Sequence, residues 1–217
     1  MRMLHIIATP RGSQSHSLRV SEAFLKGVRE QSGDVTVDVV DLYDHDLPAL
    51  TGDNIEAKYT LMVGRPIDRG HAESWQQVES LIEHFVSADA YLITAPMWNF
   101  GVPYALKYYI DCVVQPGYLF RYDETGQVVP MVNGKRMVCV TTRGADYSAG
   151  TFLHPYDFQE PYLRAIFGFV GITDLQFIHA QPMDITPHQR EAALTGAVAQ
   201  AHELGKGFLS RPVGAPA

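Results

Sequence analysis

Short apolar runs alternate with longer amphipathic segments along most of the chain. Five of the runs are rich in β-branched and aromatic residues, which is typical of buried strands. They cover residues 4–8, 35–42, 90–95, 136–141 and 175–178. The segments between them carry apolar residues at helical spacing. This alternation predicts an α/β fold with a five-stranded parallel sheet and helices on both faces, a three-layer sandwich.

The helical segments have recognisable faces and N-terminal signals. The final one begins at Thr186-Pro187-His188-Gln189, which has the form of a capping box with Pro at the first helical position. Helices are predicted after Ser17, near residues 55–62, from Trp75 to about Ala88, after Pro103, from the capping pair Asp157 and Glu160 to about Phe169, and from Thr186 to Phe208.

An unusual loop follows the third predicted strand. It holds Pro96, Met97, Trp98, Asn99 and Phe100, where a surface loop would usually be polar. In an open α/β sheet, ligands bind at the carboxyl ends of the strands. A planar aromatic ligand would explain this composition. The alternative is an ordinary turn in which the Trp and Phe side chains fill a local core.

The loop after the first strand has the parts of a phosphate site. Thr9, Ser15 and Ser17 offer hydroxyl groups, Arg11 offers a guanidinium, and His16 lies where a helix begins. A helix N-terminus adds free backbone N–H groups and a positive dipole end. The spacing matches neither the Rossmann fingerprint nor the Walker A motif. The alternative is that Ser15 or Ser17 only caps the helix, although capping requires neither Arg11 nor the other hydroxyls.

A third loop of this kind follows the fourth strand and contains Thr142, Arg143, Gly144 and Ala145. Its free N–H groups could meet a polar ring edge or an anion. Without a Rossmann fingerprint, the flavodoxin-like strand order 2-1-3-4-5 is the expected one, and in that order the first and third strands flank the switch point where FMN binds in the type case. The three loops then converge on one crevice, which favours an FMN site.

An excursion at residues 115–127 resembles a β-hairpin, because apolar and polar positions alternate there and Glu124-Thr125-Gly126 forms a turn. Its aromatic residues, Phe120 and Tyr122, could form part of a substrate wall. Packing between two subunits is an equally good interpretation.

Size and charge narrow the classes of function. The chain of 217 residues predicts one domain over residues 1–210, followed by a flexible tail at 211–217. A formal charge of -7 argues against nucleic acid or an anionic membrane as partner. No apolar run reaches the roughly 18 residues of a membrane span, so we expect a cytoplasmic protein. The His and Cys residues show no metal-ligand spacing, and Asp44-His45-Asp46 is interpreted as a solvated turn.

Several motifs together resemble a known family. They are Thr9-Pro10-Arg11 with Ser15-His16-Ser17, then Ala95-Pro96-Met97-Trp98-Asn99-Phe100, Phe120-Arg121-Tyr122, Thr142-Arg143-Gly144 and Phe167-Gly168-Phe169-Val170-Gly171-Ile172. In this order they resemble the FMN-dependent NAD(P)H azoreductases, also described as NAD(P)H:quinone oxidoreductases. The Pro-Met-x-Asn-Phe element is the most specific of them. Trp98 stands where the family often has Tyr, Pro10 where some members have Ser, and Ala145 where Gly is frequent.

The resemblance implies bound FMN, with its phosphate on the loop from Thr9 to Ser17, its ring along Pro96 to Phe100 and its pyrimidine edge at Arg143 to Ala145. It implies a homodimer and a ping-pong transfer of hydride from NADH or NADPH, through FMN, to quinones, azo compounds or nitro aromatics. No side chain need act as a base or nucleophile. Candidates for the acceptor pocket are Phe120, Tyr122, Tyr147 and Phe158, which could equally be core or interface residues.

Two other classes of protein fit parts of the pattern. A flavodoxin-type electron carrier would bind FMN without turnover, but the long segments at residues 50–70 and 115–129 favour a built pocket. A phosphate-binding regulatory module would bind no flavin. A hydrolase would need a nucleophile elbow of the Gly-x-Ser-x-Gly type, which the sequence does not contain.

Overall fold

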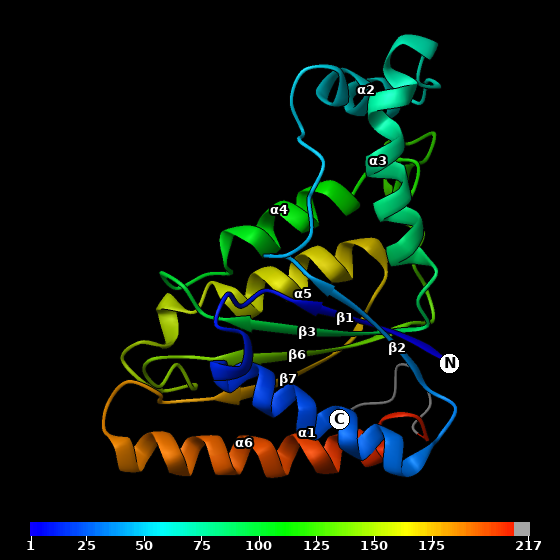
Figure 1. Cartoon of the computed structure of the whole chain (residues 1–217). Helices are drawn as coiled ribbons and strands as arrows, with labels where there is room; N and C mark the ends of the chain where they lie inside the picture. The colour runs from blue at the N-terminus through cyan, green and yellow to red at the C-terminus, as the bar shows by residue number, and fades with distance from the viewer. Residues whose placement is uncertain (211–217) are drawn as a thin grey trace.

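A parallel sheet of five strands organises the protein. The computed structural model describes residues 1–210, so the tail expected at 211–217 lies outside the described residues. The strands are β1 (Arg2–Ile7), β2 (Thr36–Asp41), β3 (Ala90–Pro96), β6 (Arg136–Thr142) and β7 (Asp174–Ala180). They lie in the order β2-β1-β3-β6-β7, and all four pairings are parallel (Figure 1). The five parallel strands predicted from the apolar runs are confirmed.

The expected order 2-1-3-4-5 needs a correction in its numbering. The excursion after the third strand forms two short antiparallel strands, β4 (Phe120–Tyr122) and β5 (Val128–Pro130), in a sheet of their own. The last two strands of the main sheet are therefore numbers 6 and 7 in chain order. Strand β7 is longer than the predicted 175–178 because the polar His179 fits into it, with its ring bonded to Thr141 of β6 at 2.7 Å.

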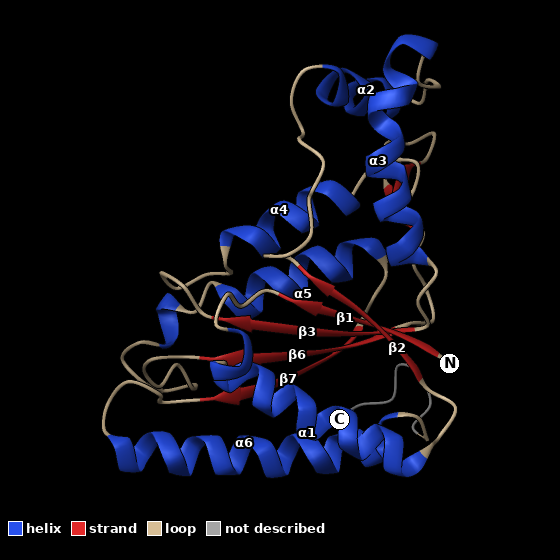
Figure 2. Ribbon diagram, viewed as in Figure 1, coloured by secondary structure: helices blue, strands red, loops and turns tan. Residues whose placement is uncertain are grey.

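Helices cover both faces of this sheet (Figure 2). On one side lie α1 (His16–Gln31) and α6 (Pro187–Phe208); on the other lie α3 (Arg69–Val86), α4 (Tyr104–Val113) and α5 (Gln159–Val170). Each side has its own cluster of buried apolar residues, centred on Phe24 and Leu194 on the first and on Trp75 and Phe167 on the second. Helix α2 (Asp53–Met62) packs on α3, and the two extend away from the sheet at the top of Figure 1.

The caps of three helices match their sequence signals. Ser15 accepts the N–H of Leu18 at 3.2 Å at the start of α1, and Thr186 accepts that of Gln189 at 3.2 Å at the start of α6. Asp157 accepts two N–H groups at the start of α5. Because the side-chain oxygens replace missing intrahelical acceptors, they fix where each helix begins. Two short 3₁₀ helices, Gly12–Gln14 and His154–Tyr156, precede α1 and α5.

Two glycines allow α1 and α6 to approach closely. A Cβ atom at Gly27 would lie 2.2 Å from the carbonyl oxygen of His202, and one at Gly205 would lie 2.2 Å from that of Phe24. Since no side chain tolerates such a contact, the two helices meet backbone to backbone. This contact holds α1, whose N-terminus forms part of the candidate site, against the body of the fold.

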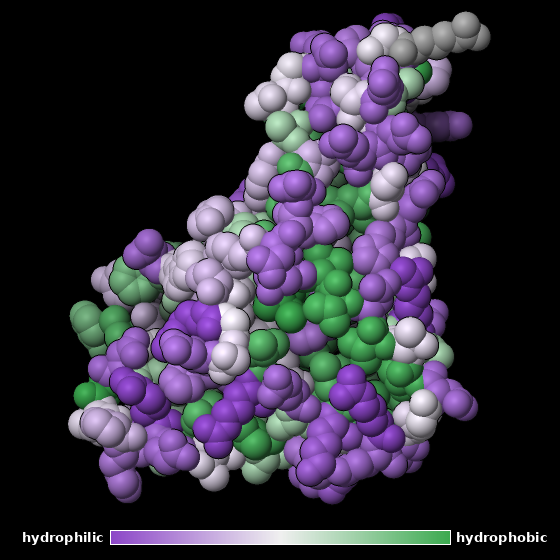
Figure 3. All heavy atoms as spheres, viewed as in Figure 1, coloured by the Kyte–Doolittle hydropathy of each residue, from purple (hydrophilic) through white to green (hydrophobic). Residues whose placement is uncertain are grey.

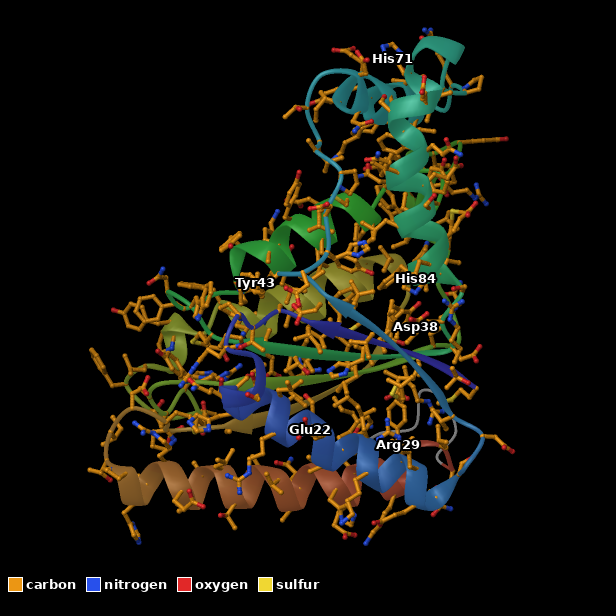
Figure 4. The ribbon with its side chains drawn as sticks, viewed as in Figure 1. Glu22, Arg29, Asp38, Tyr43, His71 and His84 are labelled. Atoms are coloured by element: carbon orange, nitrogen blue, oxygen red, sulfur yellow. The ribbon has the colours of Figure 1, made fainter. Side chains whose placement is uncertain are left out.

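Two surface features involve β2 and α3. In the view of Figure 3, hydrophobic side chains gather over the edge strand β2 and the adjoining end of α3, and Val39 of β2 is exposed. Nearby, His84 of α3 and Asp38 of β2 point toward each other and bond at 2.8 Å (Figure 4). No helix within residues 1–210 is both long and apolar enough to span a membrane. The same residues contain no cluster of three or more potential metal ligands.

Candidate functional site

Loops from four strands form one pocket at the carboxyl edge of the sheet. The pocket has a volume of about 200 Å³. It is lined by Thr9, Pro10, Arg11, Ser15, His16 and Ser17 after β1, by Pro96, Met97 and Trp98 at the end of β3, by Thr142, Arg143 and Gly144 at the end of β6, and by Met183 and Asp184 after β7. The structure therefore brings together the three loops that the sequence analysis singled out. Of the predicted cofactor residues, Asn99, Phe100 and Ala145 do not line it.

One end of the pocket is built from donors. Thr9, Ser15 and Ser17 are buried, and the Ser15 and Ser17 hydroxyls lie 3.0 Å apart. Helix α1 begins at His16, so the N–H groups of His16 and Ser17 have no intrahelical acceptor. The pKa of the His16 ring is lowered by partial burial and, to a smaller extent, by the nearby charges of Arg11, Arg190 and Arg19.

This set of donors fits a phosphate group. Hydroxyls, a guanidinium and helix N–H groups all donate to phosphate oxygens, and the helix dipole favours their negative charge. Ser15 also caps the helix, as the alternative interpretation holds. Capping explains neither the burial of the Ser17 hydroxyl beside it nor the position of Arg11 in the pocket wall. Ser15 can therefore serve both purposes.

The aromatic loop forms a tight reverse turn. Trp98 and Gly101 exchange two backbone hydrogen bonds, at 3.1 and 2.9 Å, around Asn99 and Phe100. Both central residues have positive φ, 47° and 69°, as a type I′ turn requires. The turn directs the Phe100 ring toward Tyr156, with ring centroids 5.5 Å apart. Within residues 1–210, the N–H groups of Asn99 and Phe100 make no hydrogen bond.

The loop after β6 separates a charged side chain from free backbone donors. The Arg143 guanidinium is 2 % exposed, and its Nη1 pairs with Asp157 Oδ2 at 2.9 Å. Burial lowers the pKa of Arg143, while Asp157 and Glu160 oppose that shift. The guanidinium is thus paired with a carboxylate just before the start of α5. The N–H groups of Gly144 and Ala145 make no hydrogen bond among the described residues, so they remain available to a polar ring edge.

A fourth loop was missed by the sequence analysis. Met183 and Asp184 follow β7, and both donate their N–H groups to the Gly144 carbonyl, at 3.1 and 2.8 Å. Asp184 packs so closely that a Cβ atom on Gly144 would lie 2.7 Å from its Oδ2. The position of these residues just beyond the fifth predicted strand was the available signal, because all carboxyl ends of a parallel sheet meet at one edge.

The four aromatic candidates for an acceptor pocket fall in two places. Tyr147 lies near the Phe100 ring, at 6.4 Å between centroids, and Phe158 is exposed and donates its N–H to the Phe100 carbonyl at 3.0 Å. Phe120 is buried in the core cluster, and Tyr122 packs against it on β4. In a single chain, none of the four candidates lines the pocket.

Other aromatic residues lie beside the site but belong to no motif that the sequence analysis identified. Tyr156 and the strongly exposed Phe152 extend the ring cluster outward from Phe100. On the other side of the turn, Trp98 lies within 6.4 Å of both Tyr43 and Tyr104, measured between ring centroids. Tyr43 follows β2 and lies at the same edge of the sheet (Figure 4).

Comparison with known proteins identifies the class. The model of a family described by its flavodoxin-like fold matches residues 1–204. A relative from Nitratidesulfovibrio vulgaris strain Hildenborough, the FMN-dependent NADH:quinone oxidoreductase, is 38% identical over 207 residues, which cover 95% of this chain and 99% of the relative. The chain belongs to this flavodoxin-like family.

Two further comparisons narrow the group. FMN-dependent NADH:quinone oxidoreductase 3 of Pseudomonas fluorescens is 32% identical over 212 residues, or 97% of this chain and 98% of the relative. The crystal structure of an FMN-dependent NADH-azoreductase from Bacillus anthracis, in complex with FMN, superposes with a TM-score of 0.85 at 26% identity. That comparison covers 97% of this chain and all of the other.

Proposed function

We propose that the protein is an FMN-dependent oxidoreductase that oxidises NADH and reduces quinones and aromatic azo compounds. One observation carries this conclusion. The donor-rich end of the pocket and the aromatic turn meet at the carboxyl edge of a flavodoxin-like sheet, in a chain whose relatives are FMN-dependent NADH:quinone oxidoreductases. We also expect the enzyme to reduce nitro aromatic compounds.

The residues present fit FMN in three parts. Thr9, Arg11, Ser15, Ser17 and the N-terminus of α1 would hold the phosphate. Met97, Trp98 and the backbone of the Asn99–Phe100 turn would hold the ring, and the free N–H groups of Gly144 and Ala145 would meet its pyrimidine edge. When bound, FMN supplies the transfer of hydride from NADH to the acceptor. The chain supplies binding, orientation and N–H groups that favour negative charge at the ring edge.

A homodimer is part of the proposal. Phe100, Phe152, Tyr156 and Phe158 are all more than 40 % exposed, and they lie close together at the Asn99–Phe100 turn. Because large apolar patches near a site usually have a partner, a second copy of the chain is a suitable cover. Sedimentation at several protein concentrations tests this: a mass of two chains supports the homodimer, and a single chain at all concentrations refutes it.

Three more expectations concern the layers of the fold, the number of domains and the location of the protein. The two apolar clusters on opposite faces support a three-layer sandwich, and their extent supports a single domain over residues 1–210. An enzyme that consumes NADH works where that reductant is made, so we expect a cytoplasmic location.

Steady-state kinetics tests the proposed function. We expect NADH to be consumed only when both FMN and a quinone are present, with parallel lines in double-reciprocal plots, as a ping-pong cycle requires. A flavodoxin-type electron carrier would bind FMN but would not turn over NADH. Consumption that does not depend on FMN would contradict the assignment.

A further inference from the structure

Gln159 is fully buried at the start of α5, between two of the loops that form the pocket. Its Nε2 donates to the carbonyl of Pro96 at 3.0 Å, and its Oε1 accepts from Nε of Arg143 at 3.4 Å. A guanidinium can only donate and a carbonyl can only accept, so these partners fix the orientation of the amide. One side chain thus joins the loop after β3 to the loop after β6.

This link lies where the sheet stops holding the two loops together. The β3–β6 ladder ends at the pair of Pro96 and Thr142, where the N–H of Met97 donates to the Thr142 carbonyl at 2.8 Å. The N–H of the next residue, Arg143, faces the other neighbour and donates to Ala180 of β7 at 3.0 Å. Beyond this pair, the described residues show no backbone hydrogen bond between the two loops, and the Gln159 side chain bonds to Pro96 at the end of one and to Arg143 at the start of the other.

The residues beside Gln159 hold it in place and contact the same two loops. Asp157 accepts the N–H of Gln159 at 3.0 Å and pairs with the Arg143 guanidinium. Phe158 donates its N–H to the Phe100 carbonyl. The three successive residues Asp157, Phe158 and Gln159 therefore all bond to one or both of these loops. In a buried network of this kind, removing one partner leaves others unpaired at high cost.

We propose that Gln159 is a positioning residue that fixes the spacing between the loop of Met97 and Trp98 and the loop of Gly144, and thereby sets the affinity for FMN and the midpoint potential of bound FMN. The inference rests on the proposed function. Gln159 does not line the pocket, so it acts through Pro96 and Arg143. Such supporting contacts matter because groups that face a ligand lose their effect when displaced by about 1 Å.

Two substitutions separate the two hydrogen bonds. Gln159→Met keeps the length of the side chain and removes both bonds. Gln159→Glu keeps an acceptor for Arg143 and replaces the donor to Pro96 with a carboxylate oxygen, which also adds a negative charge; it serves as the second variant if Gln159→Met does not fold. Tyr91→Phe is the matched control, because it also removes a buried side-chain donor to a backbone carbonyl, that of Phe85 at 3.0 Å, at the opposite end of β3.

Titration calorimetry of the apoproteins with FMN, with a reductive titration of each complex, measures both quantities. We expect the Gln159 variants to bind FMN about tenfold more weakly. We also expect a lower midpoint potential in Gln159→Met, because the N–H groups near Gly144 are less well placed to stabilise negative charge on the reduced ring. Gln159→Glu tests affinity alone, since its added charge lowers the potential by itself. Tyr91→Phe should lose thermal stability but keep wild-type affinity and potential.

Wild-type affinity and potential in a folded Gln159 variant would overturn this inference while leaving the proposed function intact. Equal losses of affinity in Tyr91→Phe would also overturn it, because the effect would then follow general destabilisation. A wild-type protein that binds no FMN would instead refute the proposed function.

Discussion

Asn99 and Phe100 hold consecutive left-handed backbone conformations, with φ angles of 47° and 69°. Asn adopts this conformation with little strain, whereas Phe rarely does. Two hydrogen bonds between Trp98 and Gly101 and a third from Phe158 hold the turn in place. Strained backbone of this kind is concentrated at ligand sites, and here it directly follows Trp98 of the pocket wall.

Paired substitutions at Phe100 isolate this strain. Phe100→Ala and Phe100→Gly both remove the ring, so they lose the same contacts with Tyr147 and Tyr156. Only Gly relieves the backbone, so we expect Phe100→Gly to be the more stable of the two by about 1 kcal/mol. This reverses the usual order of Ala and Gly. Chemical unfolding of both variants measures the difference, and a more stable Phe100→Ala would show that the turn is not strained.

Arg11 is expected to contribute a charged contact to phosphate. Arg11→Ala should weaken FMN binding by roughly 1.5–3 kcal/mol, the range for a hydrogen bond to a charged group. The matched control is Arg29→Ala, since Arg29 lies in the last turn of α1, away from the pocket (Figure 4). The control should bind FMN as the wild type does. An unchanged FMN affinity in Arg11→Ala would exclude that residue from the phosphate site.

Two glycines of α6 should respond in opposite ways to the same substitution. Gly205→Ala places a Cβ atom 2.2 Å from the Phe24 carbonyl oxygen, so α1 and α6 must separate. We expect a loss of about 3 kcal/mol in the free energy of unfolding. Gly196→Ala meets no atom within 4 Å and should stabilise the helix by about 0.5–1 kcal/mol. Similar values for the two variants, measured by urea unfolding, would refute the close packing of these helices.

His5 should make the protein sensitive to mild acid. Burial lowers the pKa of His5 from 6.5 to about 4, and the ring bonds to Thr94 Oγ1 at 2.7 Å. Between these pH values the unfolded chain binds a proton that the folded chain excludes. Stability is therefore full above pH 6.5 and falls as the pH is lowered toward 4, by roughly 3 kcal/mol at most.

The substitution His5→Gln checks this origin of the pH dependence, because an amide can bond to Thr94 but does not titrate. Its free energy of unfolding should vary less between pH 6.5 and pH 4 than that of the wild type. His45→Gln, at an exposed histidine, should keep the wild-type dependence. If His5→Gln shows the full wild-type slope, another group is responsible.

Much of the fold could be predicted because its signals are local. Burial on both faces makes each strand a continuous apolar run, as in residues 90–95, and the hydroxyl at Thr186 marks the start of α6 directly. The excursion at residues 115–127 was predicted from alternation and from the turn at Glu124-Thr125-Gly126, and it forms strands β4 and β5. The site loops could be predicted because parallel strands bring their carboxyl ends to one edge.

The remainder depends on contacts between distant segments. Nothing local to Arg143 indicates that its guanidinium pairs with Asp157, and nothing local to Gln159 indicates that its amide reaches Pro96. The left-handed conformation of Phe100 goes against its own preference, so tertiary contacts must impose it. Asp184 enters the pocket wall only because the loop after β7 folds back over Gly144.

The visible spectrum of the purified protein with FMN, before and after anaerobic NADH, tests the central claim most directly. The account predicts flavin absorption bands that remain with the protein on gel filtration, bleach on addition of NADH and return when a quinone is added. Bound flavin that NADH does not reduce would make the protein an electron carrier. A protein that retains no flavin would contradict the account, because the donors around Ser17 and the turn at Phe100 would then serve another ligand.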